Sequence, residues 1–438
     1  MSSLSWDARK ARIVVLGVAA VAFLSKMALA AATQGPADVR FFYGFARAIA
    51  LAGPVRIYAE PLPHLPVYNH PPLASWMLLA MEKLMGIGVP FAPMIRFPAC
   101  LADFLTVLLV FEVVRRRRTL RTATACALGA ALCPVLFGTS GYHGNTDSVA
   151  VMFALAAAWL LADRARFATA GVAAALCISV KFVPVVVVPL LFVAAWRVGR
   201  PAFARFTAGF AALFLAVWGP VLATVPAGLK ANVLEYAGGN FSFWGVVQFA
   251  RWAEVPEPYI ALVRGPGHYL VVAAIVTLGA WLAWRRPADT PVAVAVTLGT
   301  LLLLSTASGV QYLAWPAAGL FVIGLWPGLA YALVVGGVTT SVYGMQRPVH
   351  WTDTEMAFGA LGWALLGVSV AVGVHRILTA APLDIARPRT EPGPGPAAHP
   401  AAAAPPGPHP PAAERPAPRP PAAAPDQTAR PARVEKHP

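Results

Sequence analysis

Residues 94–118 read MIRFPACLADFLTVLLVFEVVRRRR, an apolar run that ends in four consecutive arginines. A helix needs about 20 predominantly apolar residues to cross the hydrocarbon core of a bilayer. Clustered Lys and Arg mark the cytoplasmic ends of such helices. The stretch therefore predicts a transmembrane helix over about 94–114 that enters from the outside and ends in the cytoplasm.

The composition extends this reading to the rest of the chain. Of the 438 residues 58% are hydrophobic and only 12% are charged, whereas a soluble domain carries about a quarter charged residues. The formal net charge of +15 comes from short basic clusters between apolar runs, which is the positive-inside pattern and not a polyanion-binding patch. This excludes a soluble enzyme, a disulfide-stapled secreted domain and a nucleic-acid-binding protein. We expect an all-α polytopic protein of the cell membrane, embedded in the lipid bilayer.

The basic clusters must share one face of the membrane, which places both termini in the cytoplasm. Residues 168–196 have basic residues on both sides and are too short for two full spans, so they predict a short hairpin broken near Lys181–Pro184. Ala28–Ala30 resembles a signal-peptidase site, but we favour an uncleaved anchor. In all we expect about twelve membrane segments, at about 12–31, 94–114, 122–139, 146–162, two within 168–196, 203–223, 267–284, 288–304, 314–326, 328–345 and 356–376.

The two longest regions outside these segments, residues 32–92 and 381–438, differ in their predicted structure. The first outside loop, about 32–92, should hold an amphipathic helix from Val39 onward, with Phe41, Phe42, Phe45 and Ile49 toward lipid or protein, and an interfacial or re-entrant helix over about 73–85. Residues 381–438 are rich in Pro and Ala and lack apolar periodicity, which predicts a disordered cytoplasmic tail after a membrane domain of residues 1–380. Any chemistry should lie at the outer face.

Two parts of the first outside loop carry candidate groups. Asp38 stands at a predicted helix start, where it is either an N-cap or a catalytic carboxylate. Tyr68 and His70 precede Pro71-Pro72, a pair that fixes the backbone at the start of the next helix. That motif presents polar groups at the interface or simply forms an aromatic loop.

Further polar residues lie within or between the apolar runs. Arg96 and Asp103 are seven residues apart and so share a helical face, which fits either a structural contact or a functional one. Asn145 and Asp147 either cap the next helix or belong to a site. Lys181 either snorkels toward water or meets an anion in the broken hairpin. A late outside loop adds an amide and a phenol, Gln311 and Tyr312.

Several common motifs do not occur. The four cysteines lie in apolar stretches without CxxC spacing and should pack as small hydrophobes. The sequence contains no DxD, Walker-type or HExxH motif. We therefore assign no metal ligands and no certain cofactor, although a divalent metal is compatible with the sequence. An outward-facing site without a nucleotide motif suits a donor carried by lipid.

The order of these motifs resembles the GT-C superfamily of polytopic glycosyltransferases, and within it bacterial protein mannosyltransferases and aminoarabinose transferases. The similar segments are Asp38 with Tyr43 and Ala46-Arg47, Tyr68–Trp76, Arg96–Pro98 with Leu105–Phe111, Gly144–Asp147, Lys181–Pro184 and Gly309–Trp315. The resemblance implies a polyprenyl-phosphate sugar donor, a glycan, lipid or protein acceptor, and Asp38 as the catalytic base. It implies donor-phosphate or substrate contacts for Tyr43, Tyr68, His70, Arg96, Asn145, Asp147, Lys181, Gln311 and Tyr312. Aminoarabinose transferases carry Glu-Lys before Pro-Pro where this chain has Asn69-His70, so His70 would take over the contact of that lysine.

Together these features predict an inverting transfer of a hexose, with mannose favoured, to an acceptor hydroxyl at the outer membrane face. One alternative is a flippase of lipid-linked sugars or another polytopic transporter, although we find no internal repeat. Another is a polymerase or ligase of surface glycans that uses the same kind of donor.

Overall fold

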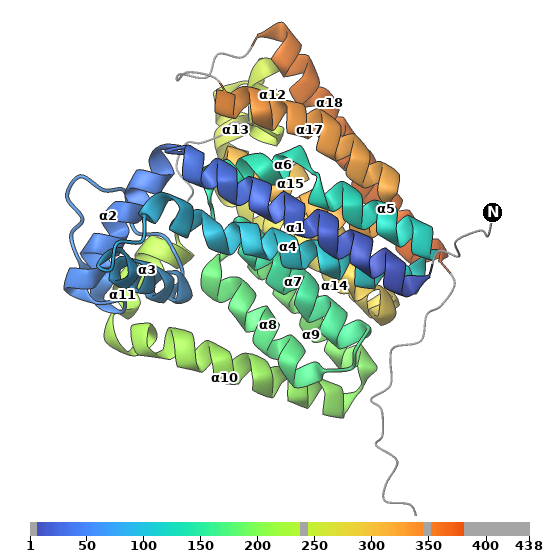
Figure 1. Ribbon diagram of the computed structural model, residues 1–438, viewed down its shortest axis with the longest axis horizontal. Helices are drawn as coiled ribbons and strands as arrows, with labels where there is room; N and C mark the ends of the chain where they lie inside the picture. Colours follow the sequence, from blue (N-terminus) through green and yellow to red (C-terminus); the bar gives the residue numbers. More distant parts are fainter. Residues whose placement is uncertain (1–6, 237–243, 345–351, 381–438) are drawn as a thin grey trace, which may run out of the picture. The chain divides into compact units, whose positions relative to one another are not determined.

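The computed structural model describes residues 7–236, 244–344 and 352–380, and the regular structure of these residues is helical (Figure 1). The predicted disordered tail over 381–438 lies outside the described residues. The elements are α1 (Ala8–Ala32), α2 (Ala37–Ala52), η1 (Arg56–Ala59), α3 (Pro72–Met85), α4 (Phe91–Arg117), α5 (Leu120–Ala131), α6 (Pro134–Leu136), η2 (Phe137–His143), α7 (Asp147–Ala162), α8 (Phe167–Val180), η3 (Val183–Val187), α9 (Val188–Val198), α10 (Arg200–Thr224), α11 (Pro226–Leu229), η4 (Lys230–Leu234), α12 (Val246–Trp252), α13 (Glu257–Arg264), α14 (Pro266–Arg285), η5 (Pro287–Asp289), α15 (Thr290–Leu304), η6 (Val310–Leu313), α16 (Ala314–Ile323), α17 (Leu325–Gly344) and α18 (Asp353–Thr379).

Eight helical stretches among the described residues are long and apolar enough to cross a membrane. They are Ala8–Ala32, Phe91–Arg117, Leu120–His143, Arg200–Thr224, Pro266–Arg285, Pro287–Leu304, Leu325–Gly344 and Asp353–Thr379. Four shorter apolar stretches are Asp147–Ala162, Phe167–Val180, Val183–Val198 and Val310–Ile323. These positions agree with the predicted segments, except that α16 already ends at Ile323, three residues earlier than expected. The number of actual crossings stays a prediction.

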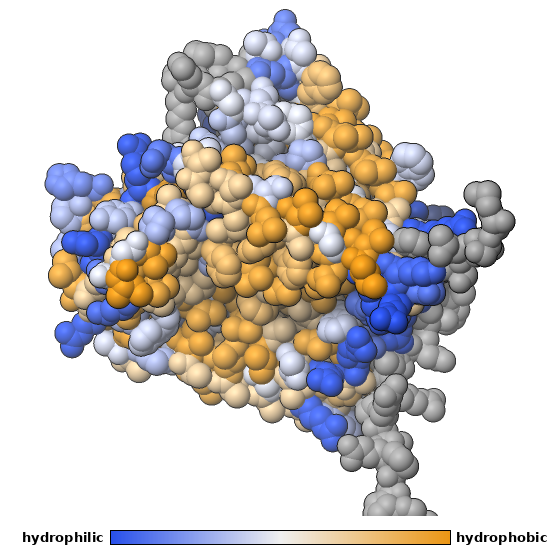
Figure 2. Space-filling model, viewed as in Figure 1, coloured by the Kyte–Doolittle hydropathy of each residue, from blue (hydrophilic) through white to orange (hydrophobic). Residues whose placement is uncertain are grey.

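The helices differ in how much of their surface they bury. The apolar window of α15 is 83% buried, whereas the windows of α10 and α14 are only 22% buried. Figure 2 shows hydrophobic side chains across the face formed by α1 and α4, and hydrophilic side chains near the N-terminal end of α1. A helix that is apolar on its exposed side as well faces lipid and not water. α15 is therefore the centre of the bundle, and α10 and α14 lie at its periphery.

The stretch 167–198 forms the predicted broken hairpin. α8 ends at Val180, Lys181 has an extended backbone, and the chain becomes helical again from Val183. α8 packs against α10 at very short range, because a Cβ on Gly171 or Gly209 would lie 2.0 or 2.1 Å from a backbone carbonyl oxygen of the other helix. This contact holds the break in the hairpin at a defined place in the bundle.

The first outside loop folds into the predicted helices. α2 buries Phe42, Phe45 and Ile49, whereas Phe41 is 37% exposed, so its predicted contact with lipid stays a prediction. α3 begins with Pro72 in its first turn, as the Pro-Pro pair predicts. The buried faces of α2 and α3 share one apolar cluster with the start of α4 and with residues of α10 and η4. The loop is thus a packed part of the membrane domain.

Arg96 and Asp103 do not bind each other; each makes a buried polar contact with another part of the chain. The Asp103 carboxylate binds Lys26 of α1 instead, with 2.6 Å between Nζ and Oδ2. Arg96 donates to the carbonyl oxygens of Ala30 and Thr33, at 2.6 and 2.8 Å, and so holds the C-terminal end of α1. Both contacts join α1 to α4.

The arginine block at the end of α4 also makes structural contacts. Arg117 is only 8% exposed and makes two hydrogen bonds to the Asp163 carboxylate, at 2.9 and 3.0 Å. Its Nε also lies 3.3 Å from Asp289. This arginine therefore ties α4 to the end of α7 and to η5.

The four cysteines are buried and free, as expected: Cys100, Cys126, Cys133 and Cys177.

Candidate active site

Asp38 lies in the first turn of α2 and is bound by a histidine from a distant part of the chain. The helix begins after Pro36, which occupies the N-cap position, so the interpretation of Asp38 as the N-cap is wrong. Its Oδ2 lies 2.8 Å from Nε2 of His143, and the Nδ1 of His143 lies 2.8 Å from the Tyr343 hydroxyl. The Asp38 side chain is 36% exposed and that of His143 only 6%. A carboxylate that is bound by a histidine and still 36% exposed is suited to accept a proton.

The π-helical turn η2 places His143. The turn closes with a hydrogen bond from the Gly144 amide to the Thr139 carbonyl oxygen, and Gly144 adopts a left-handed conformation with φ of 77°. A Cβ on Gly144 would lie 2.3 Å from Cγ of Arg96. Both the positive φ and the close approach require glycine at this position. The turn therefore packs on α4 and directs His143 toward α2.

A second group surrounds Lys181 in the broken hairpin. Its Nζ lies 3.6 Å from Oδ2 of Asp147, and Oδ1 of Asp147 accepts a hydrogen bond of 2.6 Å from Nε1 of Trp315. The Tyr312 ring stacks on Trp315 at 4.3 Å between centroids, and Lys181 lies 6.0 Å from the Tyr312 centroid. Lys181 is only 13% exposed, so it does not snorkel into water. Three separate motifs of the sequence thus form one cationic and aromatic cluster.

Electrostatic coupling shows that the two groups are neighbours. The negative charges of Asp147 and Asp38 both act on Lys181. Lys181 therefore lies beside Asp147 and within electrostatic range of Asp38.

His70 lies within range of the same two groups. It is 7% exposed and its ring packs on Phe42, with 4.9 Å between ring centroids. Burial, and secondarily the charge of Lys181, lower the pKa of His70 to about 3, while Asp38 acts in the opposite direction. His70 is consequently neutral at physiological pH. It can serve a ligand as a hydrogen-bonding group, but it does not supply the charge of the lysine it was expected to replace.

The remaining predicted residues lie around this centre. The Tyr68 hydroxyl is buried and 2.9 Å from the Ser75 hydroxyl, which gives Tyr68 a packing function. Tyr43 is 45% exposed and packs edge-on against Phe91. Gln311 lies in η6, one residue before Tyr312.

The other two predicted residues, Arg96 and Asn145, are buried near the η2 turn. Arg96 holds the end of α1, and its Nε and Nη2 have no hydrogen-bond partner. Asn145 accepts a hydrogen bond from the Thr146 amide. The N-cap of α7 is Thr146, without a side-chain cap, so the capping interpretation of Asn145 and Asp147 is wrong.

Sequence reasoning did not assign three residues of this arrangement. His143 stands in the polar run before Asp147, where nothing local distinguishes it from its neighbours. Trp315 ends the Gly309–Trp315 segment, but nothing in its sequence context indicates a bond to Asp147. Tyr343 lies in the apolar helix α17 and carries no local signal at all. Only contacts across 168 to 200 residues of sequence identify Trp315 and Tyr343 as part of the site.

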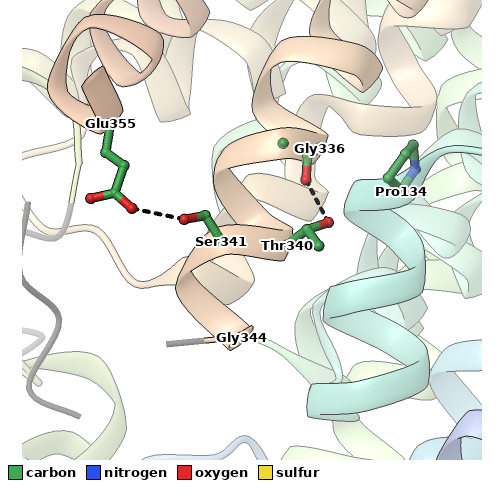
Figure 3. A pocket seen from close by; sticks show the side chains of 7 residues that line it. Pro134, Gly336, Thr340, Ser341, Gly344 and Glu355 are labelled. Atoms are coloured by element: carbon green, nitrogen blue, oxygen red, sulfur yellow. Dashed lines mark hydrogen bonds between the residues drawn. The ribbon is translucent and has the colours of Figure 1, made fainter. Parts of the chain in front are cut away.

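A cavity of about 690 Å³ lies beside α17, between Pro134 and Glu355 (Figure 3). Gly336, Gly337 and Gly344 line it together with Thr340 and Ser341. The Ser341 hydroxyl donates to Glu355 at 2.9 Å. None of the candidate residues lines this cavity. Within the described parts of the chain, no group of three or more His, Cys, Asp or Glu is placed to hold a metal ion.

Residues 69–234 match the model of the dolichyl-phosphate-mannose-protein mannosyltransferase family. The match covers well under half of the chain; it includes His70, Asp147 and Lys181 and begins after Asp38. No curated protein matches the sequence significantly. Together with the apolar helices, the family match supports a multi-pass membrane glycosyltransferase of the GT-C superfamily.

Proposed function

We propose that this protein transfers a hexose, with mannose favoured, from a polyprenyl-phosphate donor to an acceptor hydroxyl at the outer face of the cell membrane. The observation that supports the proposal is that the half-exposed Asp38 carboxylate and the buried cation Lys181 lie within electrostatic range of each other. A glycosyl transfer from a lipid phosphate needs a base for the acceptor and a positive charge for the departing phosphate. The topology proposed with it has both termini in the cytoplasm.

Asp38 acts on the acceptor. The acceptor hydroxyl gives its proton to the Asp38 carboxylate while its oxygen forms a bond to the sugar C1. The bond from C1 to the phosphate oxygen breaks, and its electron pair leaves with the polyprenyl phosphate. Attack comes from the face opposite to the phosphate, so the configuration at C1 inverts.

Lys181 acts on the donor. The phosphate that leaves gains negative charge, and a lysine ammonium group that is only 13% exposed stabilises that charge. The hydrogen bond from Trp315 fixes the Asp147 carboxylate, and the ion pair with Asp147 then holds Lys181 in place. Neutral His70 adds a hydrogen bond, and the stacked rings of Tyr312 and Trp315 form an apolar wall next to the cation.

The test is a transfer assay with the purified protein in liposomes, using radiolabelled polyprenyl-phosphate mannose and a membrane extract as acceptor. Asp38→Asn should lower the rate by about 10²-fold to 10⁴-fold, because it removes the base and keeps the shape. Glu60→Gln, an exposed carboxylate of the same loop, is the matched control and should keep full activity.

Full activity of Asp38→Asn would contradict the assignment of the base. If the wild-type protein instead moves the lipid across the bilayer and transfers no sugar, the protein is a transporter and the proposal fails. Comparing lipid and glycan extracts of a deletion strain with those of its parent would identify the sugar and the acceptor.

A further inference from the structure

Asp38, His143 and Tyr343 form a hydrogen-bonded chain that the simple base mechanism does not require. The residues come from α2, from the π-helical turn η2 and from the end of α17. Both hydrogen bonds are 2.8 Å long, and the pairs are 105 and 200 residues apart in sequence. A buried imidazole that bridges two groups at this distance is held in one orientation.

The direction of the hydrogen bonds follows from the charge of the base. An ionised Asp38 can only accept hydrogen bonds, so Nε2 of His143 must carry the proton between them. In the neutral imidazole Nδ1 then has no proton, and the Tyr343 hydroxyl donates to it. The other tautomer would point a lone pair at the carboxylate. The ionised Asp38 therefore selects the tautomer, and the Tyr343 hydroxyl supplies the hydrogen bond that the unprotonated Nδ1 accepts.

We propose that His143, supported by Tyr343, is a positioning residue that holds the Asp38 carboxylate through Oδ2 in the orientation in which it meets the acceptor hydroxyl. This inference rests on the proposed function of Asp38 as the base. A carboxylate in the first turn of a helix has several rotamers. The bond from His143 selects one of them and stabilises the ionised form, because hydrogen bonds to a charged acceptor are stronger than those to a neutral one.

Other titratable groups also act on Asp38. Lys181, between α8 and η3, and His70, before α3, are both coupled to its charge, and Tyr312 of η6 lies beside Lys181. Lys181 carries the positive charge among these groups, and its own charge is partly balanced by Asp147. Since Lys181 remains in every variant of His143, removing the histidine should weaken the stabilisation of the carboxylate without abolishing it.

Two amide variants separate the hydrogen bonds of His143. In His143→Gln the amide nitrogen reaches the place of Nε2 and keeps the donor for Asp38. In His143→Asn the shorter side chain places its amide near Nδ1, which keeps a partner for Tyr343 and removes the donor for Asp38. The two variants are similar in polarity, so they are matched controls for each other.

The assay measures kcat, KM for polyprenyl-phosphate mannose and the pH dependence of kcat/KM. His143→Asn should lower kcat about 10-fold to 100-fold with the donor KM within about 2-fold, because the base is no longer oriented. The acid limb of its pH profile should move up by about 1–2 pH units, since the ionised carboxylate has lost a charge-assisted hydrogen bond. His143→Gln should restore most of kcat and the wild-type acid limb, and Tyr343→Phe should have an intermediate effect.

The outcomes distinguish this inference from the proposed function. If Asp38→Asn, assayed beside these variants, stays active, the base assignment fails and the positioning role fails with it. If Asp38→Asn is inactive but His143→Asn keeps the wild-type kcat and acid limb, only the positioning role is overturned. An equal loss in the Asn and Gln variants, with an unmoved pH profile, also overturns it and indicates a packing role. If His143→Asn does not fold, the other two variants test the positioning role. That role requires the acid limb of the pH profile to move in Tyr343→Phe and to stay at the wild-type position in His143→Gln.

Discussion

Replacing Lys26 by methionine should destabilise the protein by about 3–5 kcal/mol, which is the range for removing one partner of a buried ion pair. The side chains of Lys26 and Asp103 are only 2% and 4% exposed, and their charged atoms are 2.6 Å apart. Lys26 also lies 5.1 Å from the centroid of the Phe137 ring. Methionine keeps the length of the side chain, so the cost comes from the uncompensated carboxylate of Asp103 inside the bundle.

The double replacement Lys26→Met with Asp103→Leu tests this origin. It removes both charges and keeps most of the volume, so its stability should return to within about 1 kcal/mol of the wild type or exceed it. The free energy of unfolding can be measured from a denaturation equilibrium in mixed detergent micelles. Lys230→Met is the control, because Lys230 and Glu235 form a pair of 2.7 Å whose side chains are 65% and 58% exposed. That variant should change stability by no more than about 1 kcal/mol.

Two results would refute this reasoning. The first is a loss of less than about 1 kcal/mol in Lys26→Met, which would mean that the Asp103 carboxylate finds water or another partner. The second is a double variant as unstable as the single one, which would place the cost in packing and not in the unpaired charge.

Two further predictions concern the site and the turn next to it. Lys181→Gln should weaken donor binding about 10-fold to 100-fold by removing a charge-assisted contact to the phosphate, and an unchanged affinity in a titration with the donor would contradict that contact. Gly144→Ala should destabilise the protein by about 2–3 kcal/mol, because a Cβ would lie 2.3 Å from Cγ of Arg96 on a backbone with φ of 77°. Gly88→Ala, with φ of 92° and open space at the Cβ position, should cost only about 1 kcal/mol in thermal unfolding, and equal losses in the two variants would rule out the contact with Arg96.

Local features of the chain predicted where the helices lie. A helix through a membrane is specified by the length of an apolar run and by the charges at its ends, and both can be read within about 20 residues. The run that ends at Arg115–Arg118 became α4, and the break at Lys181 divides α8 from α9 as expected. The helix predicted over residues 73–85 was equally legible, because Pro71-Pro72 marks its start.

Capping signals were misleading in the outer loops. Asp38 and Asp147 both stand at helix starts, where an acidic side chain commonly caps the backbone. In the structure both lie inside the first turn, and both side chains bind partners from other elements. Local propensity could not show this, because the partners decide between the two uses and they lie more than 100 residues away.

The sequence by itself determined the class of the protein, the positions of its apolar helices and a set of polar motifs between and within them. Only the tertiary structure decided which polar groups meet: Asp38 with His143 and Tyr343, Lys181 with Asp147 and Trp315, and Lys26 with Asp103. The physical reason is that the free energy of transferring a helix from water into lipid depends on the residues of that helix alone. A buried polar group, in contrast, is stable only beside a specific partner that the packing of distant helices provides.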